Sequence, residues 1–358
     1  MSEFTGVSTR WPRIFVGLAL GVAMGALFAW IGTPIPWMMG PLVGMGIAQL
    51  CGAKLQLFPY GRQTGQWLIG TSVGLYFMPS VLGALLGNVG WIFLGAILTL
   101  LMAGVGGLLL SRVSGIDKAS CYFATVPGGA AEMSVLAMKY GGNVPAVAIT
   151  QSIRIALLVL IVPPVLAYAG FAGIDRAAAQ VLPPFVADKF LMLAGFTLVV
   201  AAICAKLGVQ NAWMMGPLIS SAIVTACGVS LSRVPVELVD VGQVLLGLAL
   251  GSRFEKDFFL RYRMFIPYAI FNALYLILAC AGCAYLIAWG SGIAIGDALL
   301  ALAPGGIGEM AITAKGLDLG VAIVTAFQFV RITAANFTPP FFFPLARKWR
   351  DRWLARSR

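Results

Sequence analysis

The sequence predicts an all-α, polytopic membrane protein built from two homologous halves. Of its 358 residues, 60% are hydrophobic and only 10% are charged, whereas about a quarter of the residues in soluble domains are charged. Apolar runs follow one another along the whole chain, and several approach the ~20 residues that a helix needs to cross hydrocarbon. A set of short motifs also recurs in the same order in both halves.

The apolar runs are continuous rather than alternating, which favours helices over a transmembrane barrel. The first half contains such runs near residues 14–31, 37–52, 63–77, 89–110, 119–138 and 144–169. The second half contains them near 190–205, 212–228, 241–252, 264–288, 298–314 and 319–345. We expect no cleavable signal, because the first residues are polar and no small-residue cleavage site follows the first run.

The repeated motifs keep a nearly constant spacing. WMMGPL at Trp37–Leu42 recurs at Trp213–Leu218. The other motifs recur with a common offset that is longer by a single position: Gly65, Gln66, Gly70 and Gly74 as Gly242, Gln243, Gly247 and Gly251; Pro127, Gly128 and Gly129 as Pro304, Gly305 and Gly306; Glu132 as Glu309; Gln151 as Gln328; and Arg154 as Arg331. We therefore expect a first membrane repeat over 14–170 and a second over 188–345. A cytoplasmic N-terminal segment (1–13), a linker (171–187) and a basic cytoplasmic tail (346–358) complete the chain.

The distribution of basic residues bears on how the repeats are oriented. If all six segments of each half cross the membrane, the halves are parallel and the bases within Arg253–Arg263 face outside. If one segment of each half does not cross, the second half is inverted, and those bases and the tail both face inside. Since cytoplasmic loops carry an excess of Lys and Arg, the inverted arrangement is favoured. The sequence thus predicts about ten crossings plus two broken segments in a bacterial inner membrane, with both termini cytoplasmic.

Two segments are candidates for failing to cross. The first is the PGG segment, which would enter as a re-entrant hairpin from opposite faces in the two halves. The second is the WMMGPL segment, interrupted by Gly40-Pro41 and Gly216-Pro217. In that case the PGG segment crosses as a broken helix.

A proline followed by two glycines predicts that the helix stops and restarts, which frees backbone N–H and C=O groups within the membrane. One interpretation is a packing kink that neighbouring helices satisfy. The other is a binding site at mid-membrane, where helix ends supply partial charges. The occurrence of the break at equivalent points of two repeats favours a site at Pro127, Gly128 and Gly129 and at Pro304, Gly305 and Gly306.

Charged and amide side chains accompany both breaks. Glu132 and Glu309 each lie about one turn beyond a proline, and intramembrane carboxylates usually face a partner in the bundle interior. Arg154 and Arg331, deep in the following helix, are the expected partners, either as structural ion pairs or as binders of a substrate carboxylate. Gln151 and Gln328 lie three residues earlier and so share a helix face with the arginines.

Several function classes are disfavoured. The net charge is +11, and the charged residues lie between the apolar runs and in the tail Arg347–Arg358. This distribution indicates that the tail anchors the chain on anionic lipid, and it disfavours direct nucleic-acid binding. The six cysteines, including the C-x-x-C of Cys280 and Cys283, are expected to be core residues. We predict no enzymatic activity, no cofactor and no metal site.

The paired WMMGPL and PGGxxEM motifs, with Q-x-x-R in the next helix, resemble the AbrB-type duplicated membrane-protein family of bacteria. Members of that family are often labelled ammonia monooxygenase or transcriptional regulator. Oxygenase metal sites are built largely from imidazole, and this chain has no histidine, so the monooxygenase activity is not expected.

The PGG segment followed by a long helix also resembles the bile-acid sodium symporter and cation/proton antiporter group. That resemblance implies inverted halves with broken helices crossing near the substrate. Glu132 and Glu309 stand where such symporters carry polar sodium-binding residues, so a proton is as good an expectation as sodium.

These observations together predict a secondary active transporter of a small organic solute that works by alternating access. Its partners would be the solute, a coupling ion and membrane lipid, and a homo-oligomer is left open. The alternative is a membrane-embedded sensor that affects gene expression indirectly and does not transport.

Overall fold

The computed structural model describes residues 10–171, 182–229 and 231–337, which form helices and connecting loops without β-strands. The predicted tail, most of the linker and most of the N-terminal segment lie outside these residues. Five helices of the described chain are long and apolar enough to cross a membrane: Trp11–Ile31, Val89–Ser114, Val144–Tyr168, Ala187–Lys206 and Arg263–Ser291. The fold class predicted from the sequence is therefore confirmed.

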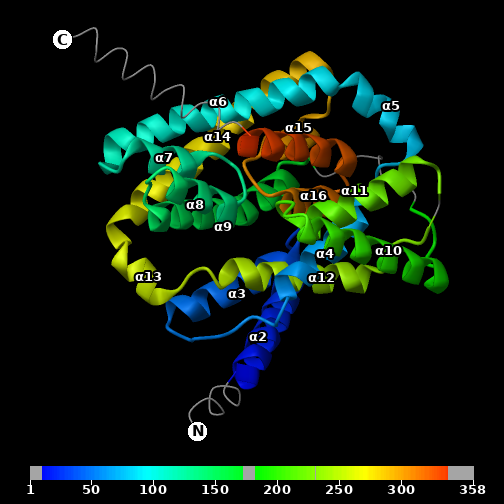
Figure 1. Cartoon of the computed structure of the whole chain (residues 1–358), viewed down its shortest axis with the longest axis horizontal. Coiled ribbons are helices and arrows are strands. Elements are labelled where there is room, and N and C mark those ends of the chain that lie inside the picture. The colour runs from blue at the N-terminus through cyan, green and yellow to red at the C-terminus, as the bar shows by residue number, and fades with distance from the viewer. Residues whose placement is uncertain (1–9, 172–181, 230, 338–358) are drawn as a thin grey trace.

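The helices form two bundles, and each bundle takes helices from both halves of the chain (Figure 1). We call the first the glycine bundle: α2 (Arg10–Ile31), α3 (Pro36–Leu50), α4 (Gly61–Gly74), α10 (Ala187–Lys206), α11 (Ala212–Ala226) and α12 (Val236–Gly251). We call the second the broken-helix bundle: α6 (Val89–Ser114), α7 (Lys118–Thr125), α8 (Ala130–Lys139), α9 (Val144–Tyr168), α14 (Ile266–Ser291), α15 (Ile295–Leu302), α16 (Ile307–Gly316) and the helix Val321–Phe337. The connections between them run through α5 (Pro79–Gly87) and, in the second half, α13 (Lys256–Arg261) and η2 (Arg263–Phe265).

The helix boundaries repeat with the spacing of the motifs. In the broken-helix bundle, α14, α15 and α16 begin and end at the positions equivalent to the ends of α6, α7 and α8. In the glycine bundle, both ends of α11 likewise correspond to those of α3, with the shorter offset of the WMMGPL motif. Equivalent sequences therefore form equivalent helices in the two halves.

The glycines of the repeated motifs let the two halves interlock. A Cβ atom on Gly70 would lie 2.7 Å from the carbonyl oxygen of Met214 in α11, and one on Gly247 would similarly meet the carbonyl oxygen of Met38 in α3. Each glycine face therefore packs on the WMMGPL helix of the other half, at backbone contact distance. Gly65 and Gly242, which are equivalent residues, also face each other, as a two-fold relation between the halves requires.

Two details differ from the expectation. The WMMGPL segments are not interrupted, because α3 and α11 run through Pro41 and Pro217 as continuous helices. Instead, the chain bends by 88° between α4 and α5, a feature that the sequence did not indicate.

The helices α3, α11 and α12 also have only 15, 15 and 16 residues. At 1.5 Å per residue they reach about 22–24 Å, less than the ~30 Å of a hydrocarbon core. Five long helices, or six if α4 and α5 are counted as one bent span, meet the length criterion within the described residues, fewer than the crossings expected.

Candidate functional site

A cavity of about 460 Å³ lies between the two bundles, and both PGG segments reach it. This volume is within the range of small-molecule sites. The broken-helix bundle contributes Gly128, Gly129, Glu132, Arg154, Gly306 and Glu309 from the predicted site residues. The others, Pro127, Gln151, Pro304, Gly305, Gln328 and Arg331, are not part of this lining.

The two breaks have the same local geometry. In each, the amide after the proline donates to the carbonyl before it, from Gly128 to Val126 at 2.9 Å and from Gly305 to Ala303 at 2.8 Å. This is the hydrogen bond of a tight turn centred on the proline, whose fixed φ suits it. A new helix then starts after Gly129 and after Gly306, both in extended conformation. The predicted stop and restart of the helix is therefore observed in both halves.

The carbonyl end of each break is satisfied by the amide and the guanidinium of the following helix. Gln151 Nε2 donates to the carbonyl oxygens of Phe123 and Val126 at 2.8 and 2.9 Å, and Arg154 donates to those of Thr125 and Val126 at 3.3 Å. A cation at the C-terminal end of a helix also interacts favourably with the negative end of the helix dipole.

The second half repeats this arrangement. Gln328 Nε2 donates to the carbonyl oxygens of Leu300, Ala301 and Ala303 at 2.8–3.2 Å. Arg331 donates to those of Ala303 and Gly305. Both arginines are only 1% exposed. The ion pairs expected between these arginines and the glutamates are not formed in the described part of the chain, because the guanidinium groups are directed at main-chain carbonyls.

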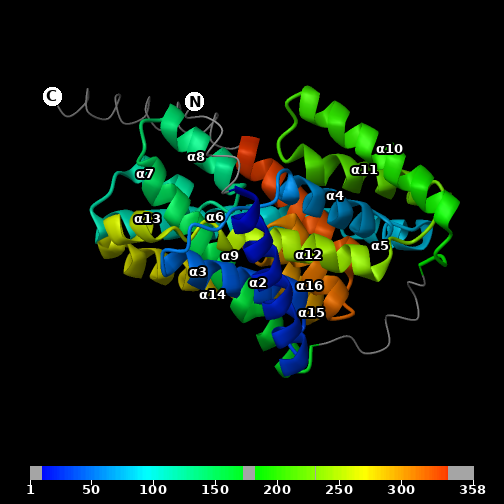
Figure 2. The same cartoon turned by 90° about the horizontal axis from the view of Figure 1, so that it is seen from below.

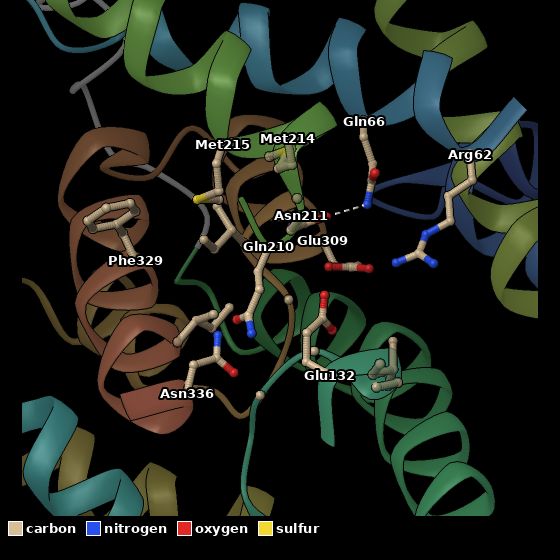
Figure 3. A pocket seen from close by; sticks show the side chains of 18 of the residues that line it. Arg62, Gln66, Glu132, Gln210, Asn211, Met214, Met215, Glu309, Phe329 and Asn336 are labelled. Atoms are coloured by element: carbon tan, nitrogen blue, oxygen red, sulfur yellow. Dashed lines mark hydrogen bonds between the residues drawn. The ribbon is translucent and has the colours of Figure 1, made fainter. Parts of the chain in front are cut away.

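On the other side of each break, where a new helix starts with free backbone N–H groups, the chain carries a glutamate. A Cβ atom placed on Gly129 would collide with the Glu132 carboxylate, and one on Gly306 would collide with that of Glu309. Each carboxylate therefore folds back over the N-terminal end of its own helix, where the helix dipole favours negative charge. Figure 3 shows the two carboxylates pointing toward one another in the cavity.

The glycine bundle supplies charged and polar residues that sequence reasoning did not place in the site. Arg62 at the start of α4 and Arg253 after the end of α12 both line the cavity. Gln66 donates to the side-chain oxygen of Asn211 at 2.8 Å, which ties α4 to the start of α11 at the cavity wall (Figure 3). The recurrence of Gly65-Gln66 as Gly242-Gln243 was the available signal, since the same glutamine follows the same glycine in both halves.

Arg253 lies in a group of four charges. Burial lowers the pKa of its guanidinium, nearby Arg62 lowers it further, and Glu309 and Glu132 act in the opposite direction. The cavity thus combines the carboxylates of Glu132 and Glu309 with the guanidinium groups of Arg62, Arg154 and Arg253, and no ion pair joins them among the described residues.

The positions equivalent to the cavity mouth in the other half are closed. Arg62 and Asn336 line the cavity, whereas their equivalents Val239 and Val159 are 2% and 0% exposed. On that side Lys315 Nζ donates to Ser72 Oγ at 3.2 Å, which joins the end of α16 to α4. The equivalent helices α8 and α12 do not pack against each other as closely as α16 and α4 do. The molecule is therefore open on one side of the breaks and sealed on the other. Figure 2 shows the helices of the two bundles from below.

Comparison with known proteins gives a consistent family relationship. The model of the family AbrB, described as "Transition state regulatory protein AbrB", matches residues 37–347. A Bacillus subtilis (strain 168) protein named "Uncharacterized protein YhjN" is 29% identical over 91% of this chain and 91% of its own length. An Escherichia coli (strain K12) protein named "Putative regulator AbrB" is 26% identical over 92% of this chain and 94% of its own length.

Proposed function

This chain belongs to the AbrB family, and from that membership and the cavity we propose that it is a secondary active transporter of a small organic solute. The observation that carries the proposal is the arrangement of the two breaks. Equivalent broken helices from two repeats converge on one cavity that is open on one side and sealed on the other. A packing kink would need neither the convergence nor the opening.

The proposed transport cycle exchanges the states of the two repeats. The contacts of α16 with α4 seal one side now, and the equivalent contacts of α8 with α12 would seal the other side after the exchange. We propose an inverted arrangement of the repeats in a bacterial inner membrane, with both termini cytoplasmic. Arg62 and Arg253 would then lie at a cytoplasmic mouth, in accord with the preference of basic residues for that side.

We propose that Glu132 and Glu309 couple transport to a proton or sodium gradient, with a proton favoured because both ligands are carboxylates. The test is uptake of a metabolite panel into proteoliposomes with an imposed proton or sodium gradient. We expect gradient-driven uptake by the wild type and its loss in Glu132→Gln and in Glu309→Gln. Glu237→Gln, which changes an exposed carboxylate outside the cavity, is the matched control. Uptake that is the same with and without the gradient, and the same in the wild type and in both variants, would contradict the coupling role.

The open side can be tested without knowing the solute. Single cysteines are introduced into a cysteine-free variant at Thr333 and Asn336 in the cavity, and at Ile35 and Val159 on the sealed side. A membrane-impermeant thiol reagent should label the first pair from the cytoplasmic face only. Labelling of the first pair from the external face alone would reverse the proposed orientation.

The name of the Escherichia coli relative supports a second candidate, a membrane-embedded sensor that affects gene expression indirectly. A sensor needs a ligand site but no alternation between two sides. If Ile35 and Val159 never become labelled under any gradient or solute, the sensor is favoured over the transporter.

A further inference from the structure

The charged groups of the cavity indicate the chemical class of the solute. Glu132 and Glu309 project into it from the broken-helix bundle, and Arg62 and Arg253 from the glycine bundle. None of these four side chains makes an ion pair or a hydrogen bond to another residue of the described chain, although all line the same cavity. Arg62 is exposed, whereas Glu132, Glu309 and Arg253 are partly buried, and partly buried charges are costly without partners. A ligand that carries both signs would pair with the carboxylates and with the guanidinium groups.

The groups that would hold an anion at the breaks are largely engaged by the chain itself. The terminal nitrogens of Arg154 and Arg331 donate to the carbonyl ends of α7 and α15, and the buried Nε of each is left without a partner in the described part of the chain. The N-terminal ends of α8 and α16, which attract anions in many proteins, face the chain's own carboxylates. The breaks are therefore suited to a cationic group, whereas an anionic group is better placed toward Arg62 and Arg253.

Much of the remaining cavity wall is apolar, although it also includes the amide side chains of Gln66, Gln210, Asn211 and Asn336. Met214 and Met215 of α11, Leu246 and Leu250 of α12 and Phe329 of the last described helix all line the cavity. Methionine side chains adapt to ligands of different shapes, and an aromatic ring offers a large contact area. A solute with an apolar body would bury that body against these residues.

We propose that the solute is an amphipathic zwitterion, whose ammonium group binds between Glu132 and Glu309 and whose carboxylate faces Arg62 and Arg253. The proposal deepens the transport function and rests on it for the role of the site, but the binding itself can be measured independently. An arginine guanidinium matches a carboxylate geometrically, and an ammonium group donates to two carboxylates at once.

The experiment uses probes that differ in charge but share one body. Phenylalanine carries both charges, 2-phenylethylamine only the ammonium and 3-phenylpropionate only the carboxylate. Leucine, 3-methylbutylamine and 4-methylpentanoate form an aliphatic series of the same design. Binding is measured by calorimetry on the full chain in lipid nanodiscs. We expect each singly charged probe to bind roughly tenfold more weakly than the zwitterion of its series.

Substitutions then assign each charge to its end of the cavity. Glu309→Gln should abolish the preference for phenylalanine over 3-phenylpropionate and leave its preference over 2-phenylethylamine. Arg62→Gln and Arg253→Gln should abolish the preference for phenylalanine over 2-phenylethylamine and leave its preference over 3-phenylpropionate. Glu237→Gln and Arg261→Gln, which lie outside the cavity lining, should change neither preference.

The proposal is overturned if an anionic probe binds as well as the zwitterion, if the substitutions leave the order of affinities unchanged, or if no probe of either series binds. Failure of the transport function gives a different result. Zwitterion binding without flux in proteoliposomes would refute transport and retain the solute class. Flux of another class of solute without zwitterion binding would refute the solute class and retain transport.

Discussion

Arg154 and Arg331 are buried in the broken-helix bundle with 1% exposure, and each donates to two carbonyl groups of a broken helix. A buried carbonyl without a donor costs about 1–3 kcal/mol. A helix that stops within the membrane leaves several such carbonyls at its end. We infer that the arginines first stabilise the breaks, and that the position of the glutamates in the cavity depends on them.

Replacement of these arginines tests the inference at the level of a single residue. We expect Arg331→Met to lower the unfolding free energy by roughly 1.5–3 kcal/mol, because hydrogen bonds from a charged donor are lost. Arg154→Met should cost less, since its two bonds are longer, at 3.3 Å. Thermal unfolding in detergent measures the order of stabilities, with exposed Arg112→Met as the control. Variants of full stability that lose only solute binding would assign the arginines to the ligand instead.

At the level of helices, the repeated glycines determine how the two halves meet. Gly251 of α12 approaches α3 so closely that an added Cβ would lie 2.6 Å from the carbonyl oxygen of Leu42 and 2.9 Å from the amide of Gly46. Both are backbone atoms, so neither can rotate away. The separation of α12 and α3 is therefore set by the absence of a side chain at this position.

Gly251→Ala should destabilise the fold by about 1–3 kcal/mol, as overpacking does in cores. Gly282 of α14 is the matched control, because a Cβ there meets no atom within 4 Å. Since alanine is the better helix former, Gly282→Ala should leave stability unchanged or slightly increase it. Unfolding of the two variants under the same conditions compares them directly. Equal stabilities would mean that the helices can move apart without cost.

The sequence predicted the elements that depend on local chemistry. Repeated motifs predicted repeated helices, and Pro127-Gly128-Gly129 predicted a break, because a proline and two glycines disfavour a continuous helix whatever surrounds them. The 88° bend between α4 and α5 was missed. Pro41 was expected to interrupt its helix and does not, because α3 continues through it from Pro36 to Leu50.

The site was predicted only in part, because its other half comes from distant segments. Glu132 and Glu309 could be identified from the repeat, and both line the cavity. Arg62 and Arg253 looked like ordinary basic residues at the ends of apolar segments, and a positive-inside pattern explains them equally well. Only the packing of α4 and α12 against the breaks shows that they face the carboxylates.

For the whole molecule, the difference between the two sides is the main feature. Lys315 joins the end of α16 to Ser72 of α4 on the sealed side, and Gly316 packs beside Ile35 at the start of α3. No comparably close packing joins α8 to α12 on the side of the cavity mouth, among the described residues. Opening of the sealed side would need the hydrogen bond between Lys315 and Ser72 to break.

Lys315→Met should therefore favour opening of the sealed side. In a cysteine-free background with Ile35→Cys, we expect external thiol labelling several times faster than with Lys315 present. Lys139→Met changes an exposed lysine at the end of α8 and serves as the control. An unchanged labelling rate, with the fold intact by thermal unfolding, would show that the hydrogen bond does not hold this side closed.

The equivalents of Arg62 and Arg253 in the other half are Val239 and Tyr76, so the duplication has preserved the glutamates and not the arginines. A solute carboxylate would then be held firmly in one orientation of the carrier and weakly in the other. By thermodynamic linkage, the ratio of these affinities equals the factor by which bound solute shifts the balance between orientations. A tenfold ratio corresponds to about 1.4 kcal/mol. We expect a loaded carrier to rest with its arginines toward the solute, and an empty one to turn over more freely.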